Sequence, residues 1–354
     1  MTTLLGPTLL GPGLVLLGLA MMVLVEHLSR FEIGSVAVMV FFALSGYWVM
    51  RMFDESYRHM PRPLTTFYVS RFLRIWLLYV TVFLAAMAVL GWGFGRYDPA
   101  TWAALPVLGV ATHDRDIIGI SWSLDIELQF YVLLPLLWAV ATPLRDAAGS
   151  GLLVLAVLLL PALTWALLYQ TGITLVTVYL PLFVAGAAIH LLRLRASSRL
   201  ALLSVAAFVL AAVAVYLVPE ARQLLIYGTD NPHHNKLFAL LWAVTLLPFV
   251  AWNVRQPSGP LDRHMGNLSY AVYLVHFPMI LAGRELVGRD MTDPEKLVVL
   301  LGAPVVALAV YLVFDRRYER LRRRVVRALK TPAPRRDAII SINSPSMRES
   351  DSVQ

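Results

Sequence analysis

A short stretch, residues 120–131, carries several polar side chains at the mouth of an apolar run. On a helix, Ser123, Glu127 and Tyr131 are spaced at i, i+4 and i+8 and therefore share one face. A carboxylate at the centre of a membrane span costs about 2.5–3.5 kcal/mol, so such a group is usually functional. The alternative is an ordinary helix start, with Ser121 as N-cap and acidic residues favoured in the first turn. That alternative accounts less well for Glu127, which lies deeper in the helix.

Three further residues have the chemistry to bind or activate a substrate. His27 ends the first apolar run, and neutral imidazole is the ordinary general base near neutral pH. Arg71 and Arg74 are three residues apart, so they project from one helix face and can fork onto phosphate oxygens. Simpler interpretations remain open: His27 as an interfacial side chain exposed to lipid headgroups, and the arginines as a lipid anchor.

Small and polar residues interrupt two other apolar segments, 41–47 and 269–278. Small residues inside a span favour close helix packing, and less often line a substrate passage. Tyrosine and histidine at three-residue steps roughly share a face, where polar groups should pair or line a cavity. The residues predicted to support a substrate passage are Phe41, Phe42, Ser45, Gly46, Trp122, Ser123, Tyr131, Tyr270, Tyr273 and His276.

The chain lacks cysteine, which excludes disulfides, a thiol nucleophile and Cys-ligated metals. Neither His233-His234 nor His113 beside Asp114 has the spacing of a metal site. Phosphate-binding loops, dinucleotide fingerprints and nucleophile elbows are also missing from the sequence. We therefore predict no metal site and no bound cofactor.

Composition indicates a membrane protein. Of 354 residues, 58% are hydrophobic and 15% are charged, against about 25% charged in soluble domains, and the mean hydropathy is +0.69. The net charge of +8 is concentrated in loops and in the C-terminal tail, as the positive-inside rule requires, and does not indicate nucleic-acid binding. No Lys or Arg precedes Arg30, so the first apolar run is predicted to be a retained span.

The fold class predicted is all-α, a polytopic integral membrane protein with about ten transmembrane helices. Arginine-rich loops follow every second span, which predicts that both termini are cytoplasmic. His27 then lies at an extracytoplasmic helix end, and Arg71 and Arg74 at a cytoplasmic one. A membrane domain over 1–315 would precede a basic, then Ser-rich, partly disordered tail over 316–354. The predicted spans are 13–26, 35–50, 75–92, 122–140, 152–169, 175–192, 200–218, 237–252, 268–281 and 297–314.

Taken in chain order, these residues resemble the acyltransferase 3 family of membrane O-acyltransferases. The family pattern has a His ending span one, then FF-x-x-SG, R-x-x-R, WSL-x-x-E-x-x-FY, SY-x-x-Y-L-x-H-x-P and a late acidic residue. Two positions depart from it: Leu16, where the family commonly has Arg, and Asp315-Arg316-Arg317, where Glu-x-Pro is usual. The matching residues are His27, Phe41, Phe42, Ser45, Gly46, Arg71, Arg74, Trp122, Ser123, Glu127, Phe130, Tyr131, Ser269, Tyr270, Tyr273, His276, Pro278 and Asp315.

The resemblance implies transfer of an acyl group, expected to be acetyl, to a hydroxyl of a glycan, lipid-linked sugar or exopolysaccharide. Acyl-CoA is the expected co-substrate, and the bacterial inner membrane is the expected location. His27 would be the general base, Glu127 would orient or charge-balance it, and Arg71 and Arg74 would bind the donor phosphates. Expected partners are the bilayer, acyl-CoA, the glycan or glycolipid acceptor and glycan-assembly enzymes, without nucleic acid. Two alternatives stay open: a transporter or flippase of a glycan precursor, and an inactive family member, which Leu16 favours.

Overall fold

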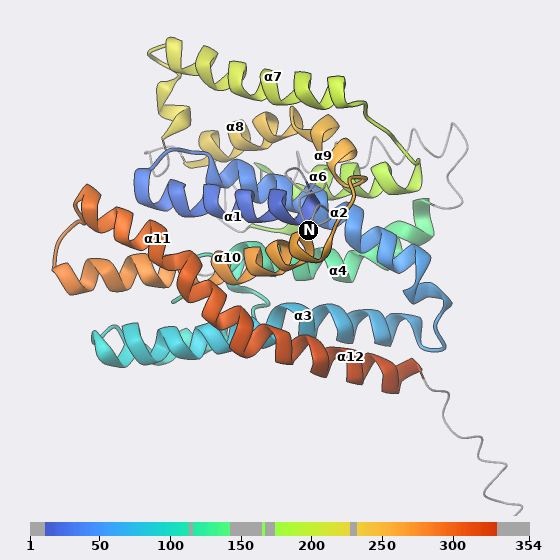
Figure 1. The fold of residues 1–354 in the computed structure, drawn as a ribbon, viewed down its shortest axis with the longest axis horizontal. Helices are drawn as coiled ribbons and strands as arrows, with labels where there is room; N and C mark the ends of the chain where they lie inside the picture. Colours follow the sequence, from blue (N-terminus) through green and yellow to red (C-terminus); the bar gives the residue numbers. More distant parts are fainter. Residues whose placement is uncertain (1–10, 113–115, 142–164, 167–173, 227–231, 331–354) are drawn as a thin grey trace, which may run out of the picture.

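The computed structural model describes residues 11–112, 116–141, 165–166, 174–226 and 232–330. Within these ranges the chain forms helices and no strand, apart from one isolated bridge between Phe31 and Ile226. Most of the long helices lie roughly parallel or antiparallel to one another in a single bundle (Figure 1). The all-α prediction is therefore confirmed for the described part of the chain.

The first half of the bundle surrounds α2, the most buried of its helices. Helix α1 begins with a proline at its first position. The Asp262 carboxylate of α10 accepts hydrogen bonds from the backbone amides of Gly13 and Leu14 at 3.1 and 2.9 Å. This side chain satisfies amides that a helix start leaves unpaired. The helices are α1 (Pro12–Ser29), α2 (Gly34–Glu55), α3 (Pro63–Ala86), which continues as a π-helix (Met87–Gly93), and α4 (Trp122–Ala141).

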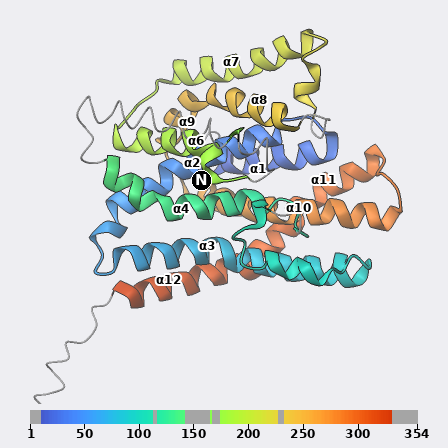
Figure 2. The same ribbon diagram turned by 180° about the vertical axis from the view of Figure 1, so that it is seen from behind.

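The second half packs on both sides of this group. Figures 1 and 2 show α7 and α8 along one side of the bundle and α3 with α12 along the other. The last two helices form one continuous rod through a π-helix (Tyr311–Asp315). The helices are α6 (Val176–Leu191), α7 (Ser198–Leu217), α8 (Pro232–Val244), α9 (Leu247–Asn253), α10 (Pro260–Val287), α11 (Asp293–Val310) and α12 (Arg316–Lys330).

Seven described helices are long and apolar enough to cross a bilayer, so the protein is a multi-pass membrane protein. The count rises to eight if the pair 234–244 and 247–253, bent by 49°, is a single broken span. The predicted number of about ten is not confirmed. Of the predicted span 152–169, only residues 165–166 are described, and α6 has 16 residues, fewer than the ~20 that a span needs.

Helix α3 differs from its predicted position in a way that matters for the site. The hydropathy pattern predicted a span over 75–92, but α3 begins at Pro63. Proline at the first helical position is compatible with a helix start, and the polar residues Thr66, Ser70 and Arg71 that follow are buried. Arg71 and Arg74 consequently lie inside the helix, in its third and fourth turns, rather than before the start of the span. The predicted tail also begins as helix, since α12 extends to Lys330.

Close packing between α2 and α6 depends on two glycines. A Cβ on Gly46 would lie 2.1 Å from the carbonyl oxygen of Phe183, and one on Gly186 would lie 1.9 Å from that of Ala43. Both obstacles are backbone atoms, so no rotamer change can relieve the overlap. The two helices therefore approach through small residues, as membrane helices commonly do.

The substitution Gly46→Val is expected to lower stability by at least about 1–3 kcal/mol, the usual cost of overpacking. The measurement is the thermal unfolding midpoint of the purified protein in detergent. Gly18→Ala is the matched control, because a Cβ there meets nothing within 4 Å and alanine favours helix. Equal midpoints for Gly46→Val and the wild type would contradict the packing described.

Candidate functional site

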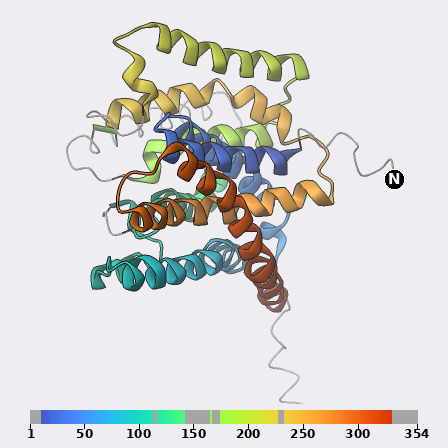
Figure 3. The ribbon, with the colours of Figure 1, turned by 60° about the vertical axis from the view of Figure 1, so that its left-hand side comes forward.

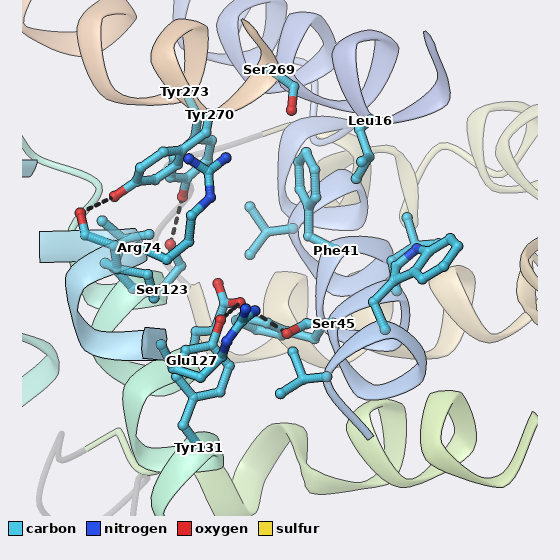
Figure 4. Close-up of a pocket in the computed structure, with 18 of the residues that line it drawn as sticks. Leu16, Phe41, Ser45, Arg74, Ser123, Glu127, Tyr131, Ser269, Tyr270 and Tyr273 are labelled. Atoms are coloured by element: carbon cyan, nitrogen blue, oxygen red, sulfur yellow. Dashed lines mark hydrogen bonds between the residues drawn. The ribbon is translucent and has the colours of Figure 1, made fainter. Parts of the chain in front are cut away.

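A cavity of about 240 Å³ lies between α1, α2, α3, α4 and α10 (Figure 4). Its walls are mostly apolar, with a few polar groups, as in small-molecule sites. Leu16, near the start of α1, and Met52, near the end of α2, both line it. The cavity therefore lies toward the bundle end where α1 starts, α2 ends and α3 starts, which is the end predicted to face the cytosol.

Glu127 is the carboxylate of this cavity. It accepts hydrogen bonds from the Ser45 hydroxyl at 2.9 Å and from the Tyr131 hydroxyl. Ser123, Glu127 and Tyr131 all line the cavity from α4, as their helical spacing predicts. The Ser123 hydroxyl lies 2.7 Å from that of Tyr273, which joins α4 to α10 across the cavity. Figure 4 shows both pairs.

The alternative of an ordinary helix start concerns Ser121 and Asp125, which lie outside the cavity lining. Ser121 directly precedes α4, but its hydroxyl donates to Asp116 at 2.9 Å instead of capping the helix. Asp116 also accepts from the amides of Ile118 and Ser121 at 2.9 and 2.6 Å. Burial raises the pKa of the Asp116 carboxyl, and these donors oppose that shift. Asp125 accepts from the Ala111 amide at 2.9 Å, so both aspartates organise the loop before α4.

Arg74 is neutralised by an acidic residue from the end of the bundle. Its Nη1 donates to the Asp315 carboxylate at 2.9 Å, and its Nη2 donates to the Asn267 amide oxygen at 3.3 Å. The guanidinium carbon also lies 5.7 Å from the centre of the Tyr270 ring. Arg74 therefore has a carboxylate and an amide partner within the protein before any ligand binds.

Arg71 differs from Arg74 in its partners. It is 8% exposed, and its Nη2 makes one long hydrogen bond, 3.5 Å, to the Tyr57 hydroxyl. Its buried Nε has no hydrogen-bond partner, and within the described residues no carboxylate oxygen lies within 4.0 Å of its guanidinium. An unpaired buried charge is costly, so an anionic ligand here would remove that cost.

His27 lies outside the group of residues that line the cavity. Its ring stacks on His276 with centroids 5.4 Å apart and meets the edge of Phe277 at 4.8 Å. His276 is fully buried, and its ring lies 5.9 Å from that of Tyr273, which lines the cavity. Ring contacts through Tyr273 and His276 thus connect the cavity lining to His27. The pairing of Glu127 with His27 stays a prediction, since the hydrogen bonds described for Glu127 come from Ser45 and Tyr131.

The other predicted supporting residues divide into two groups. Gly46 packs on α6, and Trp122 lies against Phe42 and Tyr179, with the Lys236 ammonium 5.9 Å from its ring centre. His276 lies behind Tyr273, as described above. The predicted residues that line the cavity are Phe41, Phe42, Ser45, Ser123, Tyr131, Tyr270 and Tyr273.

Comparison with protein families decides the class of this site. The family model described as an acyltransferase domain, Acyl_transf_3, matches residues 7–314. The chain belongs to the acyltransferase 3 family. The comparison with curated proteins and the comparison with solved structures each gave no match. A membrane acyltransferase is thus the general class of the protein.

Two members of this acyltransferase site had no signal in the sequence. Tyr57 and Ser70 hydrogen-bond to each other at 2.8 Å beside Arg71, yet they are 13 residues apart and lie on different helices. Spacing along one helix cannot reveal such a pair. Asp315 accepts a hydrogen bond from Arg74, and Arg322 of α12 donates one to Ser70 beside Arg71. Both residues lie beyond residue 314, where the match to the acyltransferase model ends.

Proposed function

We propose that this acyltransferase moves an acyl group, acetyl in the first instance, from acyl-CoA to a hydroxyl of a glycan, lipid-linked sugar or exopolysaccharide. The observation that carries the proposal is the buried Arg71 guanidinium, which lines the cavity without a carboxylate partner among the described residues. Acyl-CoA is cytosolic and carries phosphates. A guanidinium at the bundle end predicted to face the cytosol suits the recognition of such a group.

In this proposal the two arginines have different tasks. Arg71 binds a donor phosphate, because its guanidinium has donors to spare. Arg74 shapes the wall, because Asp315 neutralises its charge and Asn267 accepts a further hydrogen bond. The apolar walls contributed by Phe41 and Tyr270 would hold the uncharged part of the donor.

His27 would deprotonate the acceptor hydroxyl from the opposite end of α1. The hydroxyl oxygen then attacks the thioester carbonyl, the carbon–sulfur bond breaks, and the CoA thiolate leaves and takes up a proton. General-base catalysis of this kind contributes about 10²–10⁴-fold. Glu127 lines the cavity that would hold the acyl donor, so it would lie beside the donor and not beside the acceptor hydroxyl. The acceptor is expected to enter from the extracytoplasmic side, next to His27 and Phe277.

The test is acyl transfer by isolated membranes supplied with radiolabelled acetyl-CoA. Membranes that contain the protein should transfer label to a glycan or lipid-linked sugar, and membranes from a deletion strain should not. Mass spectrometry of surface glycans from both strains then identifies the modified hydroxyl. A protein that moves a glycan precursor across vesicles without transferring label would instead be the transporter, and one that does neither would be the inactive family member.

Topology provides a separate prediction for the location in the bacterial inner membrane. Reporter fusions after Arg62 and after Arg336 should report a cytoplasmic location, and a fusion within 97–116 should report an extracytoplasmic one, because arginine-rich loops are retained in the cytoplasm. Paired alkaline phosphatase and fluorescent protein fusions measure this directly. The reverse pattern would exchange the donor and acceptor sides of the proposal.

A further inference from the structure

A chain of hydrogen bonds links helix α12 to Arg71. Arg322 donates from Nη1 to the Ser70 hydroxyl at 2.5 Å, and that hydroxyl lies 2.8 Å from the Tyr57 hydroxyl. Arg71 Nη2 in turn donates to the Tyr57 hydroxyl at 3.5 Å. Arg322 lies on α12, which packs along α3 (Figure 3). This helix begins after residue 314, where the match to the acyltransferase family ends.

Arg322 is held rigidly before any ligand binds. Its Nη2 and Nε donate to the two oxygens of Glu319 at 2.7 and 2.8 Å, a bidentate geometry that fixes the guanidinium plane. Its side chain is 16% exposed. One turn earlier, the Tyr318 hydroxyl lies 2.7 Å from that of Thr81 and ties α12 to α3. The remaining guanidinium nitrogen, Nη1, then points at the Ser70 hydroxyl.

The chemistry of the two guanidinium groups fixes the donors at both ends of this chain. A guanidinium has no acceptor, so the Ser70 oxygen accepts from Arg322 and the Tyr57 oxygen accepts from Arg71. Each hydroxyl keeps a proton and a second lone pair, so the two can hydrogen-bond to each other in either direction. Ser70 is fully buried and Tyr57 is 6% exposed, so bulk water does not replace a lost partner easily. Loss of the Arg322 donor would free Ser70 and Tyr57 to pair differently and would loosen the hydrogen bond that orients Arg71.

The carboxylates of Asp315 and Glu319 are paired with arginines other than Arg71. Asp315 pairs with Arg74, and Glu319 pairs with Arg322. Both carboxylates are therefore already engaged, and neither lies within 4.0 Å of the Arg71 guanidinium. Arg322 orients Arg71 through neutral hydroxyls and leaves its positive charge available to an anion.

We propose that Arg322 is a positioning residue of the donor site, which acts through Ser70 and Tyr57 to hold the Arg71 guanidinium toward a donor phosphate. The inference rests on the proposed donor-binding role of Arg71. It makes α12 a functional part of the acyltransferase, and not merely a basic extension at the membrane surface.

The variant Arg322→Gln tests this in membranes assayed over a range of acetyl-CoA concentrations. The donor KM should rise roughly fivefold, the value of one hydrogen bond, while kcat changes less than about twofold. Arg323→Gln is the matched control: Arg323 also donates to Glu319, at 2.8 Å, but is 66% exposed. Arg323→Gln should leave KM unchanged. An equal rise in both variants would assign the effect to loss of basic charge and overturn the proposal.

A double-mutant cycle separates positioning from a general structural effect. In an Arg71→Lys background, Arg322→Gln should raise the donor KM no further, because the group that it positions is gone. Independent, multiplicative effects would overturn the proposal. Arg322→Lys should recover part of the wild-type KM, since an ammonium can still donate to Ser70.

Ser70→Ala keeps α12 and its ion pair intact and decides the question if Arg322→Gln fails to insert. It should reproduce the rise in donor KM with an unchanged amount of inserted protein. A wild-type enzyme that transfers acetyl while Ser70→Ala and Arg322→Gln keep the wild-type KM would overturn the positioning role alone. A wild-type protein that does not use acyl-CoA would overturn the proposed function and this inference with it.

Discussion

His27→Ala should abolish acyl transfer while the protein still inserts at near-normal levels. If His27 accepts the proton of the acceptor hydroxyl, its loss removes a contribution of about 10²–10⁴-fold. Insertion is expected to persist, because His276 and Phe277, on which the His27 ring packs, remain held in their own helix α10. The measurement is the initial rate of transfer from labelled acetyl-CoA, normalised to inserted protein.

His59→Ala is the matched control, since His59 is an exposed histidine in the short 3-10 helix Tyr57–His59. It should transfer acetyl at the wild-type rate. His276→Ala adds a second comparison, because His276 lies between Tyr273 and His27. An active His27→Ala protein would remove His27 from the mechanism and leave it as an interfacial side chain.

Arg71→Lys should raise the donor KM about tenfold or more, whereas Arg74→Lys should have a smaller effect. A lysine cannot reproduce the planar fork that binds phosphate oxygens in pairs. A charge-assisted hydrogen bond contributes roughly 1.5–3 kcal/mol, and a factor of ten corresponds to about 1.4 kcal/mol. At position 74, a lysine ammonium can still pair with Asp315, which is the main partner of Arg74. Steady-state kinetics over acetyl-CoA concentration in isolated membranes measure both effects.

The double variant Arg71→Lys, Arg74→Lys should show mainly the effect of the first substitution. Both lysines satisfy the positive-inside rule equally well, so insertion should not change. Unchanged kinetics in all three variants would leave the two arginines as membrane anchors and would leave the donor site without a location. A larger effect at position 74 than at position 71 would contradict the division of roles proposed from their partners.

Composition and periodicity are sufficient to predict much of this protein. Long continuous apolar runs with few charges favour membrane helices, since a helix satisfies its backbone groups within its own segment in lipid. The helical period likewise placed Ser123, Glu127 and Tyr131 on one face, and all three line the cavity. Span boundaries were less accurate, because hydropathy excludes arginines that face inward. Helix α3 accordingly begins at Pro63, 12 positions before the predicted residue 75.

The partners of each polar side chain depended on tertiary structure. Arg71 and Arg74 are equivalent in the sequence, yet one pairs with Asp315, 241 residues away, and the other has no carboxylate within 4.0 Å in the described part of the chain. Spacing also could not relate Arg322 to Ser70, which are 252 residues apart. Helix periodicity describes which residues share a face, but only the packing of one helix against another decides what that face meets. The charge left uncompensated at Arg71 is a consequence of that packing.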